Sequence, residues 1–203
     1  MTDMTDAVAT RRALLAGALG VGTLGALAPG LADAAAAAPI PTNPASDYFL
    51  KVDGMPGNST DEGHPNWIEL LTFSWGASTT VSPLTPTSGL PAAMSKPADF
   101  IFVARSGSAS PRLFLACARG MRINNVVFDV VNPSTSRVYL KATLQNVRVA
   151  SYSEAPSESD GTPLDVVRLK YARITDTFFP QRPDGGVAPP VVAGFDFATN
   201  TVI

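Results

Sequence analysis

Residues 48–76, YFLKVDGMPGNSTDEGHPNWIELLTFSWG, decide the fold. Residues 48–53 are a short β-favouring run, and residues 54–66 carry the Gly, Pro, Asn, Ser and Asp that are typical of turns. Residues 67–76 form a second run, in which four large apolar residues share one parity: Trp67, Leu71, Phe73 and Trp75. Side chains alternate between the two faces of a strand. We therefore predict two strands joined by a polar loop, with these four side chains on one buried face.

The composition is that of a globular protein. Of 203 residues, 45% are hydrophobic and 16% are charged, which argues against a disordered chain. The formal net charge of -2 gives no basic surface for nucleic acid, so no nucleic-acid partner is predicted. A single cysteine, Cys117, excludes an intramolecular disulfide.

The N-terminus has the pattern of an export signal. Arg11 and Arg12 precede the apolar run 13–28, and Ala32 and Ala34 have the small-residue spacing of a cleavage site. A membrane-spanning helix needs roughly 20 apolar residues, and the glycines in this run lower its helix propensity. We predict a twin-arginine (Tat) signal; the alternatives are an uncleaved membrane anchor or a chance Arg-Arg pair.

This signal divides the chain into three parts. Residues 1–34 are the predicted signal peptide, residues 35–46 a flexible Ala- and Pro-rich mature N-terminus, and residues 47–203 the folded domain. The predicted location is secreted or extracytoplasmic, without stable membrane insertion after cleavage.

Further strands and one helix follow the opening stretch. The strands are predicted at residues 98–104, 122–131, 138–152, 164–179 and 191–197. Residues 77–96 contain Ser, Thr, Pro and Gly throughout and are predicted to be a long surface loop. The two long strands need their edges closed to avoid aggregation. The fold class is therefore mainly β: a β-barrel of about seven or more strands with one short flanking helix.

The helix is predicted over residues 110–120. Ser110 is the expected N-cap, Pro111 the first helical residue, and Gly120 the left-handed stop. Three residues are expected to form the stripe that faces the core: Leu113, Phe114 and Cys117.

The chain resembles the hemolysin-coregulated protein (Hcp) family, the tube protein of type VI secretion. Residues that carry the resemblance are FLKVDG at 49–54, IELLTFSWG at 68–76, LFLACA at 113–118, YLK at 139–141, and GFD at 194–196, where the family often has Trp in place of Phe195. The resemblance covers roughly residues 47–200. It implies a β-barrel with a flanking helix, hexameric rings, and stacking of rings into a hollow tube.

The resemblance also implies that the loop at 77–96 reaches the neighbouring ring. Candidate ring-stacking residues are Ser78, Leu84, Leu90, Met94 and Lys96. The alternative is a mobile tip that makes no contact.

The sequence offers little catalytic chemistry. His64 is the only histidine, so it would have to serve any Ser–His–Asp or Cys–His device; the alternative is a loop histidine that fixes local hydrogen bonds. Cys117 falls on the apolar stripe, which favours a small buried hydrophobe over a reactive thiol. Oxygen ligands for calcium are present, but not in EF-hand spacing: Asp53, Asn58, Asp61 and Glu62. An ordinary solvated turn is the alternative for these residues.

We predict a structural protein rather than an enzyme, with no catalytic, cofactor or metal site. It would form a ring with copies of itself, which the resemblance implies is hexameric. The rings would stack into a tube and carry or shelter secreted cargo proteins. The export signal departs from the family, whose tube assembles in the cytoplasm. The alternative is therefore a Tat-exported scaffold or binding protein outside the cell membrane, apart from any injection machine. A secreted hydrolase on this fold is a third hypothesis.

Overall fold

The structure is a computed structural model, and it describes residues 47–79, 94–157, 161–182, 186 and 188–203. Six residues singled out in the sequence lie outside the described residues: Arg11, Arg12, Ala32, Ala34, Leu84 and Leu90. What the sequence predicts for them stays a prediction.

The described residues form eleven strands and one helix. In chain order the elements are β1 (Asp47–Val52), β2 (Ile68–Ser74), β3 (Ala77–Thr79), β4 (Ser95–Pro97), β5 (Phe100–Arg105), α1 (Ser110–Arg119), β6 (Arg122–Asn132), β7 (Arg137–Ala155), β8 (Leu164–Lys170), β9 (Arg173–Phe178), β10 (Val191–Asp196) and β11 (Thr201–Val202).

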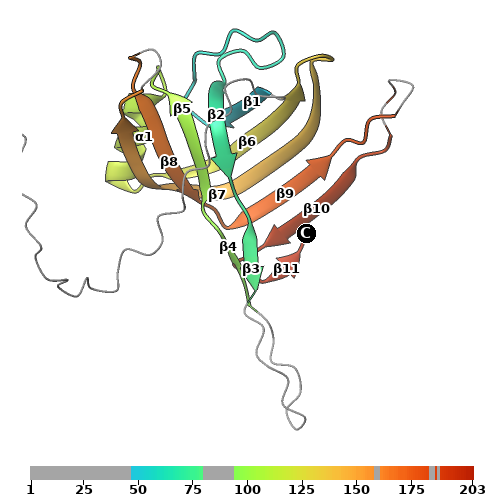
Figure 1. Cartoon of the computed structure of the whole chain (residues 1–203). Helices are drawn as coiled ribbons and strands as arrows, with labels where there is room; N and C mark the ends of the chain where they lie inside the picture. The colour runs from blue at the N-terminus through green and yellow to red at the C-terminus, as the bar shows by residue number, and fades with distance from the viewer. Residues whose placement is uncertain (1–46, 80–93, 158–160, 183–185, 187) are drawn as a thin grey trace, which may run out of the picture. The chain divides into compact units, whose positions relative to one another are not determined.

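Six of the strands close into a barrel (Figure 1). Their order is β7-β6-β1-β2-β5-β8, and β8 returns to pair with β7, with every pair antiparallel. Closure pairs the edges that the long strands would otherwise leave open. The predicted mainly-β barrel with one short helix is confirmed. Three more strands, β9, β10 and β11, extend the sheet outward from β7, and we call them the wing.

The 19-residue strand β7 connects the barrel to the wing. One of its edges pairs with β6; the other pairs with β8 beyond Arg148 and with β9 between Leu140 and Gln145. Asn146 between these two parts has a φ of 56°, a conformation that Asn tolerates better than most residues. The side-chain parity changes there, so Leu144 and Val147 both point into the core and are fully buried. The predicted strand 164–179 is likewise divided, into β8 and β9.

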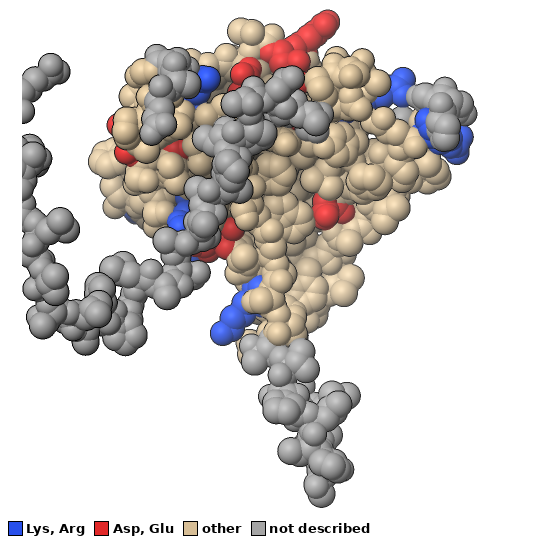
Figure 2. Space-filling view, in the orientation of Figure 1, with Lys and Arg blue, Asp and Glu red and all other residues tan. Residues whose placement is uncertain are grey.

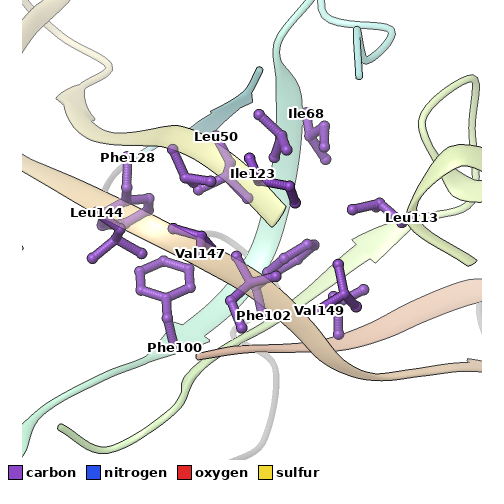
Figure 3. Packing of buried hydrophobic residues seen from close by; sticks show 14 of the residues in the cluster. Leu50, Ile68, Phe100, Phe102, Leu113, Ile123, Phe128, Leu144, Val147 and Val149 are labelled. Atoms are coloured by element: carbon purple, nitrogen blue, oxygen red, sulfur yellow. The ribbon is translucent and has the colours of Figure 1, made fainter. Parts of the chain in front are cut away.

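The core lies inside the barrel and is rich in phenylalanine (Figure 3). Phe100, Phe102 and Phe128 are fully buried, and the Phe100 and Phe128 rings lie 5.3 Å apart, edge to face. Burying each ring stabilises the fold by about 1.5–3 kcal/mol. Leu50 and Leu113 pack in the same cluster, which ties β1 and α1 to the barrel.

The prediction of which side chains of β2 are buried is wrong for the first part of the strand. Ile68 and Leu70, not Trp67 and Leu71, point into the core. A β-bulge between Leu70 and Thr72 inserts one extra residue and reverses the parity. Beyond the bulge, two of the predicted residues, Phe73 and Trp75, do pack against the core.

The helix forms where predicted, with two corrections. Its N-cap is Ala109, and Ser110 lies inside the first turn because its hydroxyl is held by other partners. The buried face follows Leu113 and Ala116, three residues apart, so Phe114 is rotated outward and is 59% exposed. Gly120 takes the left-handed C-cap with a φ of 61°, as expected.

The predicted surface loop at 77–96 is wrong at its ends. Ala77–Thr79 and Ser95–Pro97 pair as the antiparallel ribbon β3–β4. Only one of these six residues, Pro97, lacks a backbone N–H, so enough donors remain for three paired positions. The ribbon points away from the barrel (Figure 1). Two contacts hold its base: Ala98 N–H donates to Gly76 O, and the Tyr171 hydroxyl donates to the same oxygen. At the other end of the ribbon, Ser95 N–H donates to the Asn200 side chain.

Candidate functional site

The loop between β1 and β2 places His64 in a buried polar network. Its Nδ1 lies 2.9 Å from Asp61 Oδ2 and its Nε2 lies 3.2 Å from Asp129 Oδ2 on β6. Lys141 Nζ on β7 lies 3.6 Å from the same Asp129 oxygen. The imidazole ring stacks on Phe49 at 4.3 Å. These contacts tie the loop to β1 through Phe49 and to β6 through Asp129, which is 65 residues from His64 in sequence.

Opposing effects act on the two carboxyl groups beside His64. The hydrogen bond from His64 lowers the pKa of Asp61. Burial raises the pKa of Asp129, while Lys141 and His64 act in the opposite direction. A neutral imidazole can donate to only one of the two carboxylates, whereas the protonated ring satisfies both.

This geometry favours a structural role for His64 over a catalytic one. Both ring nitrogens face carboxylate oxygens, Nδ1 that of Asp61 and Nε2 that of Asp129, rather than a serine or cysteine. A general base needs one free ring nitrogen beside its nucleophile. The predicted local hydrogen bonds of His64 are confirmed.

A second polar network, which the sequence did not indicate, lies at one end of the barrel. The buried Asp165 carboxylate accepts hydrogen bonds from Ser106 (2.6 Å), Ser110 (2.5 Å) and Tyr152 (3.0 Å). Burial is the main reason that the pKa of Tyr152 is raised. These contacts fix the start of α1 against β8.

A cavity of about 680 Å³ opens beside Asp165, between the loop after β1 and the loop before α1. Its lining contains Asp61 but neither His64 nor Cys117. The cavity therefore lacks the nucleophile–histidine pair that a hydrolase of the predicted kind would need.

The remaining candidate chemistry is also dispersed. Asp61 binds His64, and Asn58 instead accepts hydrogen bonds from Ser108, so the calcium hypothesis finds no convergent site. Across the described ranges, no three or more His, Cys, Asp or Glu side chains are grouped to hold a metal ion. Cys117 is half-buried and packs against the core, as a small hydrophobe does. The described helix, α1, is too short to span a bilayer.

The wing continues the inner face of the barrel into solvent. Directly opposed residues of neighbouring strands project to the same side, and Val130, Leu140, Phe178 and Val191 are opposed in turn across β6, β7, β9 and β10. Val130 is 2% exposed, whereas Phe178 is 46% and Val191 is 63% exposed. The barrel strands cover this row at one end and leave it open at the other.

A carboxylate lies in the same open region. Asp176 is opposed to Ala142 on β7 and to Ala193 on β10, so it projects to the side that faces the core in the barrel. Burial raises its pKa, and its buried Oδ1 has no hydrogen-bond partner among the described residues. Figure 2 shows the surface over β9 and β10 as mostly uncharged, with an acidic group among uncharged residues. We call Leu140, Asp176, Phe178, Val191 and Ala193 the open wing face.

Three of the predicted stacking residues lie on the ribbon or at its end. Ser78 is opposed to Lys96 across the ribbon, and both side chains are exposed. Met94, immediately before β4, is 65% exposed. The structure thus brings Ser78, Met94 and Lys96 to one projecting element.

The family description "Type VI secretion system effector, Hcp" matches residues 49–178, more than half of the chain. The chain belongs to the Hcp family. It is 28% identical over 159 residues to Protein hcp1 of Pseudomonas aeruginosa, a match that covers 77% of this chain and 98% of that protein.

Solved structures of Hcp proteins have the same fold. Hcp1 from Salmonella typhimurium is 30% identical with a TM-score of 0.64, and the match covers 78% of this chain and 99% of that one. A structure described as a type six secretion system protein is 23% identical with a TM-score of 0.71, and the match covers 77% of this chain and 99% of that one. At this identity, the likeness is evidence for the fold alone. The Hcp resemblance predicted from the sequence is confirmed.

Proposed function

We propose that this Hcp protein is a structural, ring-forming subunit, hexameric as the family resemblance implies. Its rings stack into a tube that carries or shelters cargo in secretion. The observation that supports this proposal is the open wing face, where Phe178 and Val191 continue the core row into water. A second copy that covers this face would remove its apolar surface from water. Identical head-to-tail contacts close into a ring when the rotation between copies permits.

The test is the mass of the assembled protein. The full chain is purified as it is produced, and light scattering after size exclusion is combined with negative-stain images. The proposal expects a mass of six subunits and annular particles with a central hole. A single-subunit mass across the micromolar range would overturn it.

Stacking is assigned to the ribbon. Ser78 and Lys96 lie on the two paired strands that project from the barrel, and Met94 lies immediately before β4. The base of the ribbon is hydrogen-bonded to the domain. Replacing residues 80–93 by a short Gly-Ser link should abolish stacked rings and leave single rings intact. Tubes of unchanged length would refute this assignment.

The sequence of the N-terminus supports a second role, as a Tat-exported scaffold outside the cell membrane. Arg11 and Arg12 before an apolar run are the basis for it. N-terminal sequencing of protein recovered outside the cell separates the two roles. A start near Ala35 supports Tat export, whereas an intact Met1 supports a tube subunit assembled in the cytoplasm.

A further inference from the structure

The helix α1 has two apolar faces. Leu113 and Ala116 on the inner face are 1% and 0% exposed. A second stripe, which we call the outer stripe, follows the i, i+3, i+4, i+7 spacing of one helix face: Pro111, Phe114, Leu115 and Ala118. Phe114 is 59% and Leu115 is 46% exposed, and the other two are also exposed. A helix that is apolar on both sides is normally covered on both sides.

The surface beside the outer stripe is hollowed. A shallow hollow beside the stripe is lined by Pro111, Phe114, Tyr152, Ser153 and Glu154. The Phe114 and Tyr152 rings contact each other edge to face, with their centroids 6.0 Å apart. An aliphatic side chain such as the exposed Val191 of the open wing face would pack on the exposed surface of this aromatic pair.

Charge is also complementary between the two surfaces. Arg112 and Arg119 lie along one side of the outer stripe and are exposed, and neither belongs to the ion pairs of the described residues. Asp176 on the open wing face is partly buried, and burial raises its pKa because it disfavours the charged form. An arginine from a second subunit that pairs with the Asp176 carboxylate would offset this cost.

The two surfaces lie on opposite sides of the subunit. The helix α1 packs on β7, whose later part pairs with β8, while the wing leaves the earlier part of β7 through β9 (Figure 1). Two different complementary surfaces on opposite sides form a heterologous contact, which is the kind that builds rings.

We propose that the outer stripe of α1 on one copy of this chain packs on the open wing face of the next copy, with Arg112 or Arg119 against Asp176. This interface rests on the proposed ring. Each subunit carries both surfaces, so its outer stripe contacts one neighbour and its open wing face contacts the other.

The test uses two single variants and their mixture. Phe114→Asp places a charge on the outer stripe alone, and Val191→Asp places a charge on the open wing face alone. Each should raise the concentration at which rings dissociate by about tenfold or more. Both positions are exposed, so the fold should persist, which circular dichroism and thermal unfolding check. Thr60→Asp adds the same charge in the exposed loop after β1 and should leave rings unchanged.

Mixing the two variants gives the decisive result. Each variant keeps one intact surface, so an equimolar mixture should form one-to-one heterodimers, although neither variant dimerises alone. A mixture that stays monomeric contradicts the interface. Rings that persist in both variants also contradict it.

A charge exchange supplies a second readout. Asp176→Arg should weaken rings, as should Arg112→Asp combined with Arg119→Asp. Combining all three changes should restore assembly at least partly. No restoration would remove the ion pair from the proposal.

The outcomes separate this interface from the proposed function. A wild-type chain that is monomeric overturns the ring, and the interface falls with it. A wild-type ring that both Asp variants leave intact overturns the interface alone.

Discussion

The barrel and the wing are two parts of one sheet that differ in how far their apolar side chains are buried. In the barrel, Phe128 and Leu144 are fully buried by the strands that close over them. In the wing, Phe178 and Val191 occupy the same side of the sheet and remain 46% and 63% exposed. The difference shows that the sequence continues a core pattern past the point where this subunit can cover it. We infer that the barrel half carries the stability of the subunit and the wing half its assembly.

The largest effect on subunit stability should come from the barrel half. Phe128→Ala removes a fully buried ring that packs against Phe73 and Phe100. We expect the free energy of unfolding to fall by about 3–5 kcal/mol because a cavity remains. Urea unfolding of the separated subunit measures it. A loss below about 1 kcal/mol would contradict the assignment of this core.

His64→Ala should have the next largest effect. It leaves the buried Asp129 without its histidine partner, so we expect a loss of about 2–4 kcal/mol. Adding Asp129→Asn removes the unpaired charge, so the double variant should lose less than the sum of the single losses. Additive losses in urea unfolding would argue against coupling. If any hydrolase activity is found, it should survive His64→Ala, and its loss would revive the catalytic hypothesis.

Phe178→Ala should separate stability from assembly. The ring is half exposed, so its removal should lower the stability of the separated subunit by about 1 kcal/mol or less. The same change should markedly weaken the rings, measured by light scattering across a dilution series. A large stability loss with unchanged assembly would reverse the proposed roles of the two halves.

The smallest expected effects are pH dependences within the wing. The hydrogen bond from Arg173 lowers the pKa of Asp196. A lowered pKa gives stability that is present above the unfolded value of about 3.9 and is lost as the pH falls through the folded-state pKa. Asp196→Asn should therefore flatten the loss of subunit stability between pH 5 and about pH 2.

Asp176 should behave with the opposite sign. Burial raises its pKa, so its ionisation costs the folded subunit stability as the pH rises above the unfolded value. Asp176→Asn should thus make the separated subunit more stable at pH 7. Parallel pH profiles of unfolding for both variants would contradict these assignments.

Much of the fold followed from local patterns in the sequence. Alternating apolar residues indicated the long strands, and Gly120 ended the helix where its left-handed conformation is needed. The family resemblance, carried by residues such as the FLKVDG and GFD runs, supplied the barrel and the expectation of a ring.

Local patterns failed where backbone irregularities or contacts distant in sequence determine which side chains are buried. The bulge after Leu70 and the positive φ at Asn146 reverse side-chain parity, and neither leaves a clear signal in the sequence. Phe114 was expected in the core, but the register of Leu113 and Ala116 turned it outward.

The candidate site was harder to predict than the fold. The Asp165 network joins Asp165 to Ser106 and Ser110, which lie 59 and 55 residues before it in sequence. The open wing face depends on pairing between β7, β9 and β10, because only the register shows that Phe178 and Val191 extend the core row.

Hydroxyl-radical footprinting of Phe178 and Val191 tests the central claim most directly. Labelling of the full chain is compared between a concentrated, assembled sample and a dilute, dissociated one, with Val202, which is 81% exposed, and Phe114 read in the same digest. We predict that assembly protects Phe178, Val191 and Phe114 together. Assembled rings in which Phe178 and Val191 label as strongly as in the separated subunit would contradict the claim that a second copy covers the wing.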